Sequence, residues 1–214
     1  MINLPVINFF EKEVVGSEST DFACFHISHK NLHEEIPQEL QLKTEGIFAL
    51  FCIEGTLSFK LNEQDIILKS GNVCSFFTTN LFKSGSSSKD FSGYVLFLSS
   101  HYITRIDSHI SITYFLHSFY EPILELSDQD IEVLSTLLRF AEVRINQPGR
   151  GFSKEILYHM LMILIYELCA IYDRKPVSDK KKIRDEGLVK DFLQLVNQNC
   201  EKEHSLAFYA GKLS

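Results

Sequence analysis

Apolar residues in the segment 152–172 recur with the period of an α-helix. Four leucines at spacings of four, three and four residues fall on one stripe of this helix. We call them the leucine stripe: Leu157, Leu161, Leu164 and Leu168. A second apolar stripe, formed by Ile156, Met160 and Ile163, runs beside the first. A helix that is apolar over so much of its circumference must be covered on more than one side.

The two stripes predict two contacts. We expect one stripe to pack on the chain's own domain and the leucine stripe to contact a second copy, so that helix 152–172 forms a homodimer. The alternative is an ordinary buried helix in a monomer core, because packed helices within one chain use the same leucine spacing. Lys154, Glu155 and Glu167 interrupt the apolar run, so we expect the helix not to span a membrane.

A second amphipathic helix precedes the first. Its apolar positions recur at helical spacing and are Ile131, Leu134, Leu137, Leu138, Ala141 and Ile145. Ser127, followed by the carboxylates of Asp128 and Asp130, is typical of a helix start. The segment NQPGRG at 146–151 breaks the pattern, so the two helices are expected to form an antiparallel pair.

Before residue 100 the pattern changes to short strands. Residues 47–53, IFALFCI, are seven apolar residues in a row, which is typical of a strand covered on both faces. Residues 56–61 alternate between apolar and polar positions, and Gly55 and Gly71 mark turns. Further strands are expected at 21–28, 65–68, 73–77 and 94–98. The polar segment KSGSSSKD, 83–90, is expected to be a loop. This pattern predicts an α+β fold in which a small antiparallel β-barrel or jelly roll precedes the helix pair.

Composition and charge narrow the class of protein. Apolar residues make up 45% of the 214 residues, which indicates a globular chain. The five cysteines show no CxxC pairing, and the chain opens without a charged-then-apolar leader, so we expect a reducing, cytoplasmic location. The formal charge of −7 opposes non-specific attraction to nucleic acid.

Candidate catalytic chemistry is sparse. His26, His29 and His33 with Glu34 form a histidine cluster, which is either a metal site or a solvated loop edge; the polar surroundings favour the loop, and we assign no metal and no cofactor. No histidine lies between Glu34 and Ser100, where a cupin metalloenzyme carries its ligands, and no nucleophile elbow or P-loop is present. We therefore expect a binding protein and not an enzyme.

Three stretches of the chain carry a resemblance to a known family. They are KEILYHMLMILIYELCAIYDR (154–174), EGLVKDFLQLVNQNCEKEHSLAFYAGKLS (186–214) and IFALFCIEGTLSFKLNEQDIILKSGNVCSF (47–76). They look like the dimerisation helix, the opening of the DNA-binding domain and the strand-turn-strand core of AraC-family bacterial transcription regulators. In this family a cupin-like sensing and dimerisation domain precedes two helix-turn-helix units.

The resemblance implies four parts. They are a cupin-like sensing barrel with an N-terminal arm (1–125), dimerisation helices (126–174), a basic linker (175–187) and an incomplete start of the helix-turn-helix domain (188–214). A helix-turn-helix reads bases with its second helix, and the family continues with that helix beyond the point that corresponds to Ser214. We therefore expect a truncated regulator whose 214 residues do not bind DNA specifically, DNA being a partner only of a full-length form.

A small-molecule effector is the other partner that the resemblance implies. Apolar side chains inside a barrel can enclose such a ligand. The candidates for this lining are Phe51, Phe59, Phe76 and Phe97, with Tyr94 as a polar contact. The alternative is that these rings simply fill the core. A different function is also open at this point: a short interaction protein that heterodimerises with a full-length regulator.

Overall fold

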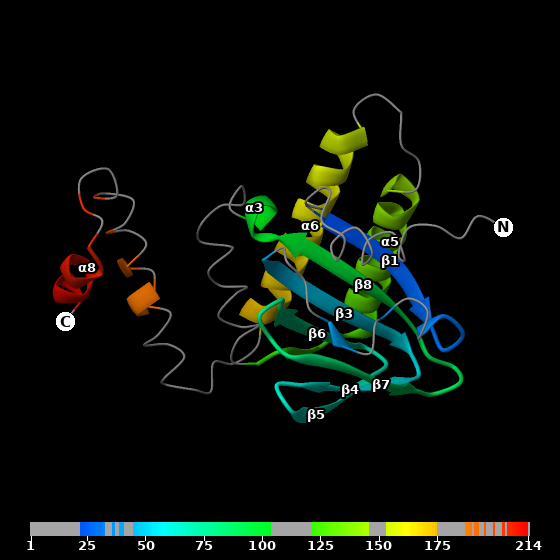
Figure 1. Cartoon of the computed structure of the whole chain (residues 1–214). Coiled ribbons are helices and arrows are strands. Elements are labelled where there is room, and N and C mark those ends of the chain that lie inside the picture. Colours follow the sequence, from blue (N-terminus) through cyan, green and yellow to red (C-terminus); the bar gives the residue numbers. More distant parts are fainter. Residues whose placement is uncertain are drawn as a thin grey trace, which may run out of the picture.

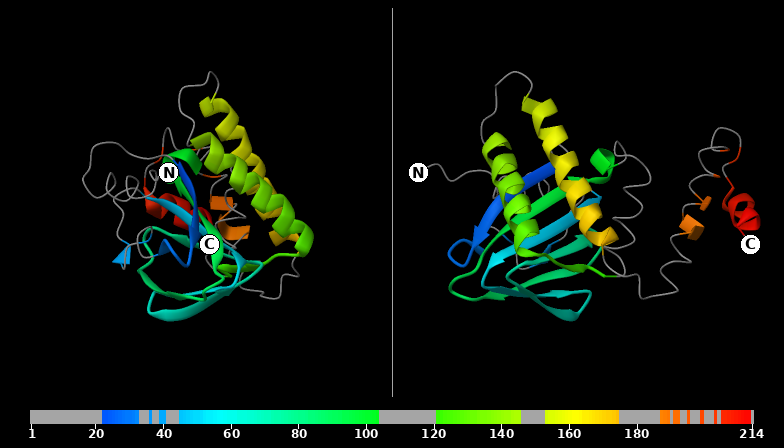
Figure 2. Two further views of the ribbon diagram at one scale, coloured as in Figure 1. Left: turned by 90° about the vertical axis from the view of Figure 1, so that its right-hand side faces the viewer. Right: turned by 180° about the vertical axis from the view of Figure 1, so that it is seen from behind.

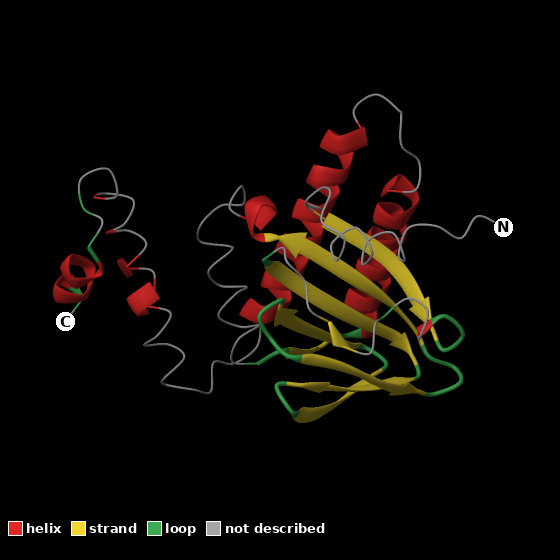
Figure 3. Cartoon of the chain, viewed as in Figure 1, coloured by secondary structure: helices red, strands yellow, loops and turns green. Residues whose placement is uncertain are grey.

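A computed structural model describes residues 22–32, 36, 39–40, 45–103, 121–145, 153–174, 187–189, 191–192, 195, 199, 203 and 205–213. These residues form two antiparallel sheets and two long helices, α5 (Asp128–Ile145) and α6 (Ser153–Asp173). Two shorter helices are α3 (Ser100–Ile103) and α8 (Leu206–Lys212). Figure 1 shows the long helices side by side across one sheet, and Figure 3 shows the strands gathered beneath them.

The larger sheet, sheet A, has five strands in the order β1-β8-β3-β6-β9. Their bounds are Phe22–Ser28, Ser92–Ser99, Gly46–Glu54, Asn72–Phe77 and Ile123–Glu125. The smaller sheet, sheet B, has the order β2-β7-β4-β5. Its strands are Glu39–Leu40, Phe82–Ser87, Thr56–Leu61 and Gln64–Lys69. Every strand pair in both sheets is antiparallel, which confirms the α+β architecture expected from the pattern of strands and helices.

Strand β3 lies in the middle of sheet A and is buried on both faces, as its run of seven apolar residues predicts. Alternate side chains point to opposite faces of a strand. Ile47, Ala49 and Phe51 therefore join the core between sheet A and the helices, and Phe48 and Leu50 join the core between the two sheets. We call these the helix-side core and the inter-sheet core.

Helices α5 and α6 close the helix-side core, and Figure 2 shows both lying across sheet A. Helix α5 contributes Leu134, Leu138 and Ala141 to this core, and all three are buried. The start of α5 contacts the end of α6 through Asp130 and Arg174, so the two helices run antiparallel. The predicted helix pair is confirmed, with boundaries within a residue or two of those expected.

Strand β7 corrects the prediction of a loop at 83–90. Residues Phe82–Ser87 pair with β4 although five of the six are small or polar. Gly85 explains how the backbones approach so closely, because a Cβ atom there would lie 2.2 Å from the carbonyl oxygen of Ser58. The Ser58 hydroxyl also donates a hydrogen bond to the carbonyl oxygen of Ser86 (2.9 Å). Backbone bonding and tight packing replace the apolar alternation by which strands are recognised.

Several expected segments lie outside the described residues. These include the arm at 1–20 and residues 175–186 of the basic linker. Near the C-terminus, the rings of Phe192 and Tyr209 make an edge contact at 5.7 Å, and the Tyr209 hydroxyl donates to the carbonyl of Glu203. The division into four parts stays a prediction.

Length and composition alone would allow one helix among the described residues to cross a membrane, Glu155–Asp173. The charged residues of this helix therefore do not exclude a membrane span, contrary to the expectation. The packing of α6 gives the better argument, because its leucine stripe is buried against sheet A as in the core helix of a globular domain.

Candidate functional site

The leucine stripe of α6 faces the interior of its own chain. The exposed fractions of Leu157, Leu161, Leu164 and Leu168 are 4%, 1%, 1% and 1%, and all four belong to the helix-side core. The prediction that these leucines contact a second copy is therefore wrong. Sheet A presents an apolar face that must be covered, and the leucine stripe covers it.

The opposite side of α6 is the exposed one. Ile156, Ile163 and Tyr166 are 38%, 49% and 48% exposed, and they follow each other at spacings of seven and three residues. The expectation that this stripe packs on the chain's own domain is wrong for Ile156 and Ile163, while Met160 at the border is half-buried and packs against the helix-side core. Both stripes exist as predicted, and it is the leucine stripe that packs on the chain's own domain.

Helix α5 presents a matching side to solvent. Val133, Phe140 and Val143 are 38%, 51% and 45% exposed, on the side of the helix away from Leu134 and Leu138. Because α5 and α6 both lie on the same face of sheet A, their exposed stripes point away from the sheet together. We call these six residues the outer apolar face: Val133, Phe140, Val143, Ile156, Ile163 and Tyr166. Their helical spacing is visible in the sequence. The leucine stripe is more regular, however, and was therefore predicted to be the contact with a second copy.

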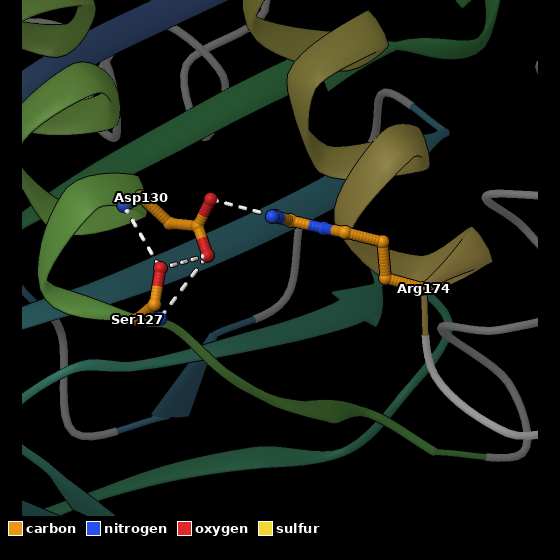
Figure 4. Close-up of polar contacts among 3 residues, drawn as sticks. All are labelled: Ser127, Asp130 and Arg174. Atoms are coloured by element: carbon orange, nitrogen blue, oxygen red, sulfur yellow. Dashed lines mark hydrogen bonds and ion pairs between the residues drawn. The ribbon is translucent and has the colours of Figure 1, made fainter.

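A polar clamp holds the helix pair at one end (Figure 4). The Ser127 hydroxyl donates to the Asp130 carboxylate (2.6 Å), and the Asp130 N–H donates back to the Ser127 hydroxyl oxygen (3.3 Å), which is a reciprocal helix cap. The Arg174 guanidinium donates to the other carboxylate oxygen (2.6 Å). The clamp therefore ties the first turn of α5 to the end of α6.

The same contacts change the pKa of Asp130. Burial alone would raise the pKa of this carboxyl, but hydrogen bonds from Ser127 and Arg174 and the charge of Arg174 outweigh it. The pKa consequently lies below its ordinary value.

The five predicted ligand-lining residues do not line one space. Phe51 and Tyr94 are register partners in sheet A and point into the helix-side core. Phe59, Phe76 and Phe97 point into the inter-sheet core. A single barrel lining that includes all five is therefore wrong, because strand alternation sends two of them to the other face of sheet A.

Rings fill the inter-sheet core. Phe48 contacts Phe97 and Phe76 at centroid distances of 5.0 and 5.4 Å. Phe82 lies 5.3 Å from Phe76 and 5.2 Å from Phe59. All five rings are buried and contact one another at the separations of packed aromatic pairs. The described rings thus resemble a filled core more than the wall of a ligand site.

The histidines of the predicted cluster bond to serines. The imidazoles of His26 and His29 lie 2.9 Å and 3.0 Å from the hydroxyls of Ser92 and Ser87, while His33 and Glu34 are outside the described residues. Among the residues that the structure places, no three histidine, cysteine or acidic side chains converge as metal ligands do.

The described cysteines are buried thiols. Cys24, Cys52, Cys74 and Cys169 are buried and form no disulfide, and Cys200 lies outside the described residues. Burial raises the pKa of Cys74 to about 12 and, as the main cause, that of Cys52 and Cys169 to about 12. These thiols stay protonated near neutral pH and act as small apolar side chains.

Comparison with known proteins gave similarities at the level of structure. No protein-family model and no curated protein matches the chain. Solved structures similar to it are AraC-like regulators, the family that the sequence stretches resemble. The AraC-like transcriptional activator CuxR is similar over 90% of this chain at 9% identity, with a TM-score of 0.44. ToxT from Vibrio cholerae, in an apo K231A form, is similar over 91% at 12% identity, with a TM-score of 0.42. The chain spans 62% of the CuxR chain and 71% of that ToxT chain.

Truncating Phe76 tests whether the inter-sheet rings are core or ligand wall. Phe76→Ala is expected to lower the free energy of unfolding by about 3–5 kcal/mol, because its ring contacts two others in a buried column. Urea denaturation measures this change. Ile67→Ala, at a position 61% exposed on β5, is the control and should cost about 1 kcal/mol or less. If Phe76→Ala costs no more than the control, the ring lines an open space.

Replacing Asp130 tests the clamp. A carboxyl whose pKa is lowered on folding contributes stability that is present above its unfolded pKa of about 4 and lost as the pH falls through its folded pKa. Asp130→Asn should therefore cost about 1 kcal/mol at pH 7, a modest value because Arg174 is largely exposed. This difference from the parent chain should shrink toward zero below about pH 4. Urea denaturation across pH measures it, with Glu132→Gln at an exposed position of α5 as the control. An unchanged difference at low pH would contradict the clamp.

Proposed function

We propose that this chain is the sensing and dimerisation part of an AraC-type transcription regulator in the cytoplasm and that it forms a homodimer through the outer apolar face. The observation that carries the proposal is the exposure of six large apolar side chains on one side of the helix pair. Large apolar patches of this kind mark interaction surfaces. The family resemblance of residues 154–174 supports the same helix as the dimer contact.

A second copy is the partner that fits this face. The outer apolar face consists of one stripe of side chains from each of two adjacent helices. Two such helix pairs can pack face to face, with the ridges of one set into the grooves of the other. A two-fold arrangement lets each side chain contact a self-complementary surface. Tyr166 and Phe140 supply large rings of the type that dominates interface energies.

A small-molecule effector is the second element of the proposal. Its support is the family resemblance, and the described residues assign it no lining, because the five candidate side chains are divided between two packed cores. An effector can regulate only by binding one arrangement of the two protomers better than another. Such a preference would change the spacing at which DNA-binding domains reach their half-sites.

Specific DNA recognition is not proposed for these 214 residues by themselves. Their formal charge is −7, and phosphate contacts need clustered lysine and arginine. The resemblance assigns only the opening of a DNA-binding domain to 186–214. Selection of the 214-residue chain against a pool of random-sequence duplexes is expected to enrich no motif. Enrichment of a defined site would overturn this assignment.

Heterodimerisation with a full-length regulator would use the same outer apolar face. It differs from the homodimer in the partner and not in the surface. A chain that is monomeric alone but captures such a regulator through this face would favour it over the homodimer.

Charged substitutions in the outer apolar face test the homodimer. The parent chain should sediment at twice the 24.6 kDa chain mass, and Phe140→Glu with Ile163→Glu should weaken self-association by at least about a hundredfold. Sedimentation velocity at several protein concentrations measures both.

Ile67→Glu is the matched control for this experiment. Ile67 is an exposed isoleucine on β5, outside the helix pair, and its substitution should leave the dimer intact. Circular dichroism checks that each variant is folded. A parent chain that stays monomeric, or a double variant that stays dimeric, would contradict the homodimer.

A further inference from the structure

Strand β1 is an edge of sheet A and pairs only with β8 among the described strands. In an antiparallel pair, alternate residues direct their N–H and C=O groups toward the neighbour and away from it. His26 and Ser28 direct theirs outward, since their N–H groups bond to side chains outside β8. Outward groups on an edge strand are a template for pairing with another chain.

Asn31 occupies part of this edge. Its side-chain oxygen accepts a hydrogen bond from the Ser28 N–H (2.6 Å), and its backbone N–H donates to the Ser28 carbonyl oxygen (3.2 Å). Its side-chain amide also donates to the carbonyl of His26 at a long 3.4 Å. One asparagine therefore bonds to three successive outward groups.

Glu142 of α5 occupies the next outward group. Its carboxylate oxygen accepts a hydrogen bond from the His26 N–H (3.1 Å). A charged acceptor makes such a bond stronger than one between neutral groups. The His26 side chain is held on both sides as well, by the Ser92 hydroxyl at 2.9 Å and by an edge contact with the ring of Tyr94 at 5.2 Å.

We propose that Asn31 and Glu142 close the outer edge of β1 at His26 and Ser28, so that the strand of a second copy cannot extend sheet A along this half of β1. Together they satisfy all four outward backbone groups of His26 and Ser28. A closed β1 removes this edge as a surface for association. The hydrogen bonds carry this inference, and it holds whether or not the outer apolar face forms a dimer.

Hydrogen exchange of the parent chain gives the first test. The amides of His26 and Ser28 should exchange slowly, like those of Phe25 and Ile27, which point toward β8. Fast exchange at His26 and Ser28, at the rate of an amide open to water, would overturn the proposal without any substitution.

Removing both side chains gives the second test. In the double variant Glu142→Ala with Asn31→Ala, exchange at His26 and Ser28 should become faster on the order of tenfold, and exchange at Phe25 should stay unchanged. Sedimentation velocity should show species larger than those of the parent chain. The same increase should occur when Phe140→Glu and Ile163→Glu are also present, because strand pairing does not use the outer apolar face.

Two single variants distinguish the loss of the hydrogen bond to β1 from a general effect of substitution in α5. Glu142→Gln keeps a side-chain oxygen that accepts from the His26 N–H and should behave like the parent chain. Glu132→Ala removes an exposed carboxylate ten residues before Glu142 in the same helix and should also change nothing. If the double variant is folded but shows neither faster exchange nor larger species, the edge is not closed by these residues.

Discussion

Burial of sheet A on both faces is the constraint on which the rest of the structure depends. Strand β3 alternates large apolar side chains to both faces, and β8 does the same beside it. Neither face can be left in water, since each buried side chain of this size contributes roughly 1.5–3 kcal/mol. Sheet B covers one face, and phenylalanine rings from both sheets fill the core between them. The helix pair has to cover the other, and this fixes which side of each helix turns inward.

The helix pair retains an apolar side after sheet A has been covered. The leucine stripe and the inner side of α5 cover the face of sheet A within one chain. Phe140, Ile163 and Tyr166 contribute nothing to that core, and exposed rings and branched side chains on two adjacent helices are costly to solubility. The clamp between Asp130 and Arg174 ties the start of α5 to the end of α6 and so holds the two helices together at this end.

Local patterns in the sequence predicted the elements well, and pairing across the fold explains what they missed. The Ser127 cap and the apolar run of β3 act locally, so both were predictable. The inward side of α6 was not, because helical spacing marks two apolar stripes without saying which one sheet A contacts. The alternation of side chains along a strand explains in the same way why the five candidate ligand-lining residues do not share one space. Phe51 and Phe76 lie in neighbouring strands that are apolar on both faces, and only the register Phe48↔Phe76 places them on opposite sides. Strand β7 was missed because Gly85 and its serines carry a backbone contact instead of an apolar pattern.

Helix α5 uses three of its sides for three different contacts. Leu138 faces sheet A, where its carbonyl also accepts a bond from the Cys24 thiol (3.6 Å); Phe140 faces outward; and Glu142 reaches the edge of β1. A shift or rotation of α5 large enough to rearrange the outer apolar face must therefore strain its bonds to β1. Packed interfaces respond to such strain by changing between discrete arrangements and not by continuous deformation. The bonds of α5 to β1 thus connect sheet A directly to the outer side of the helix pair.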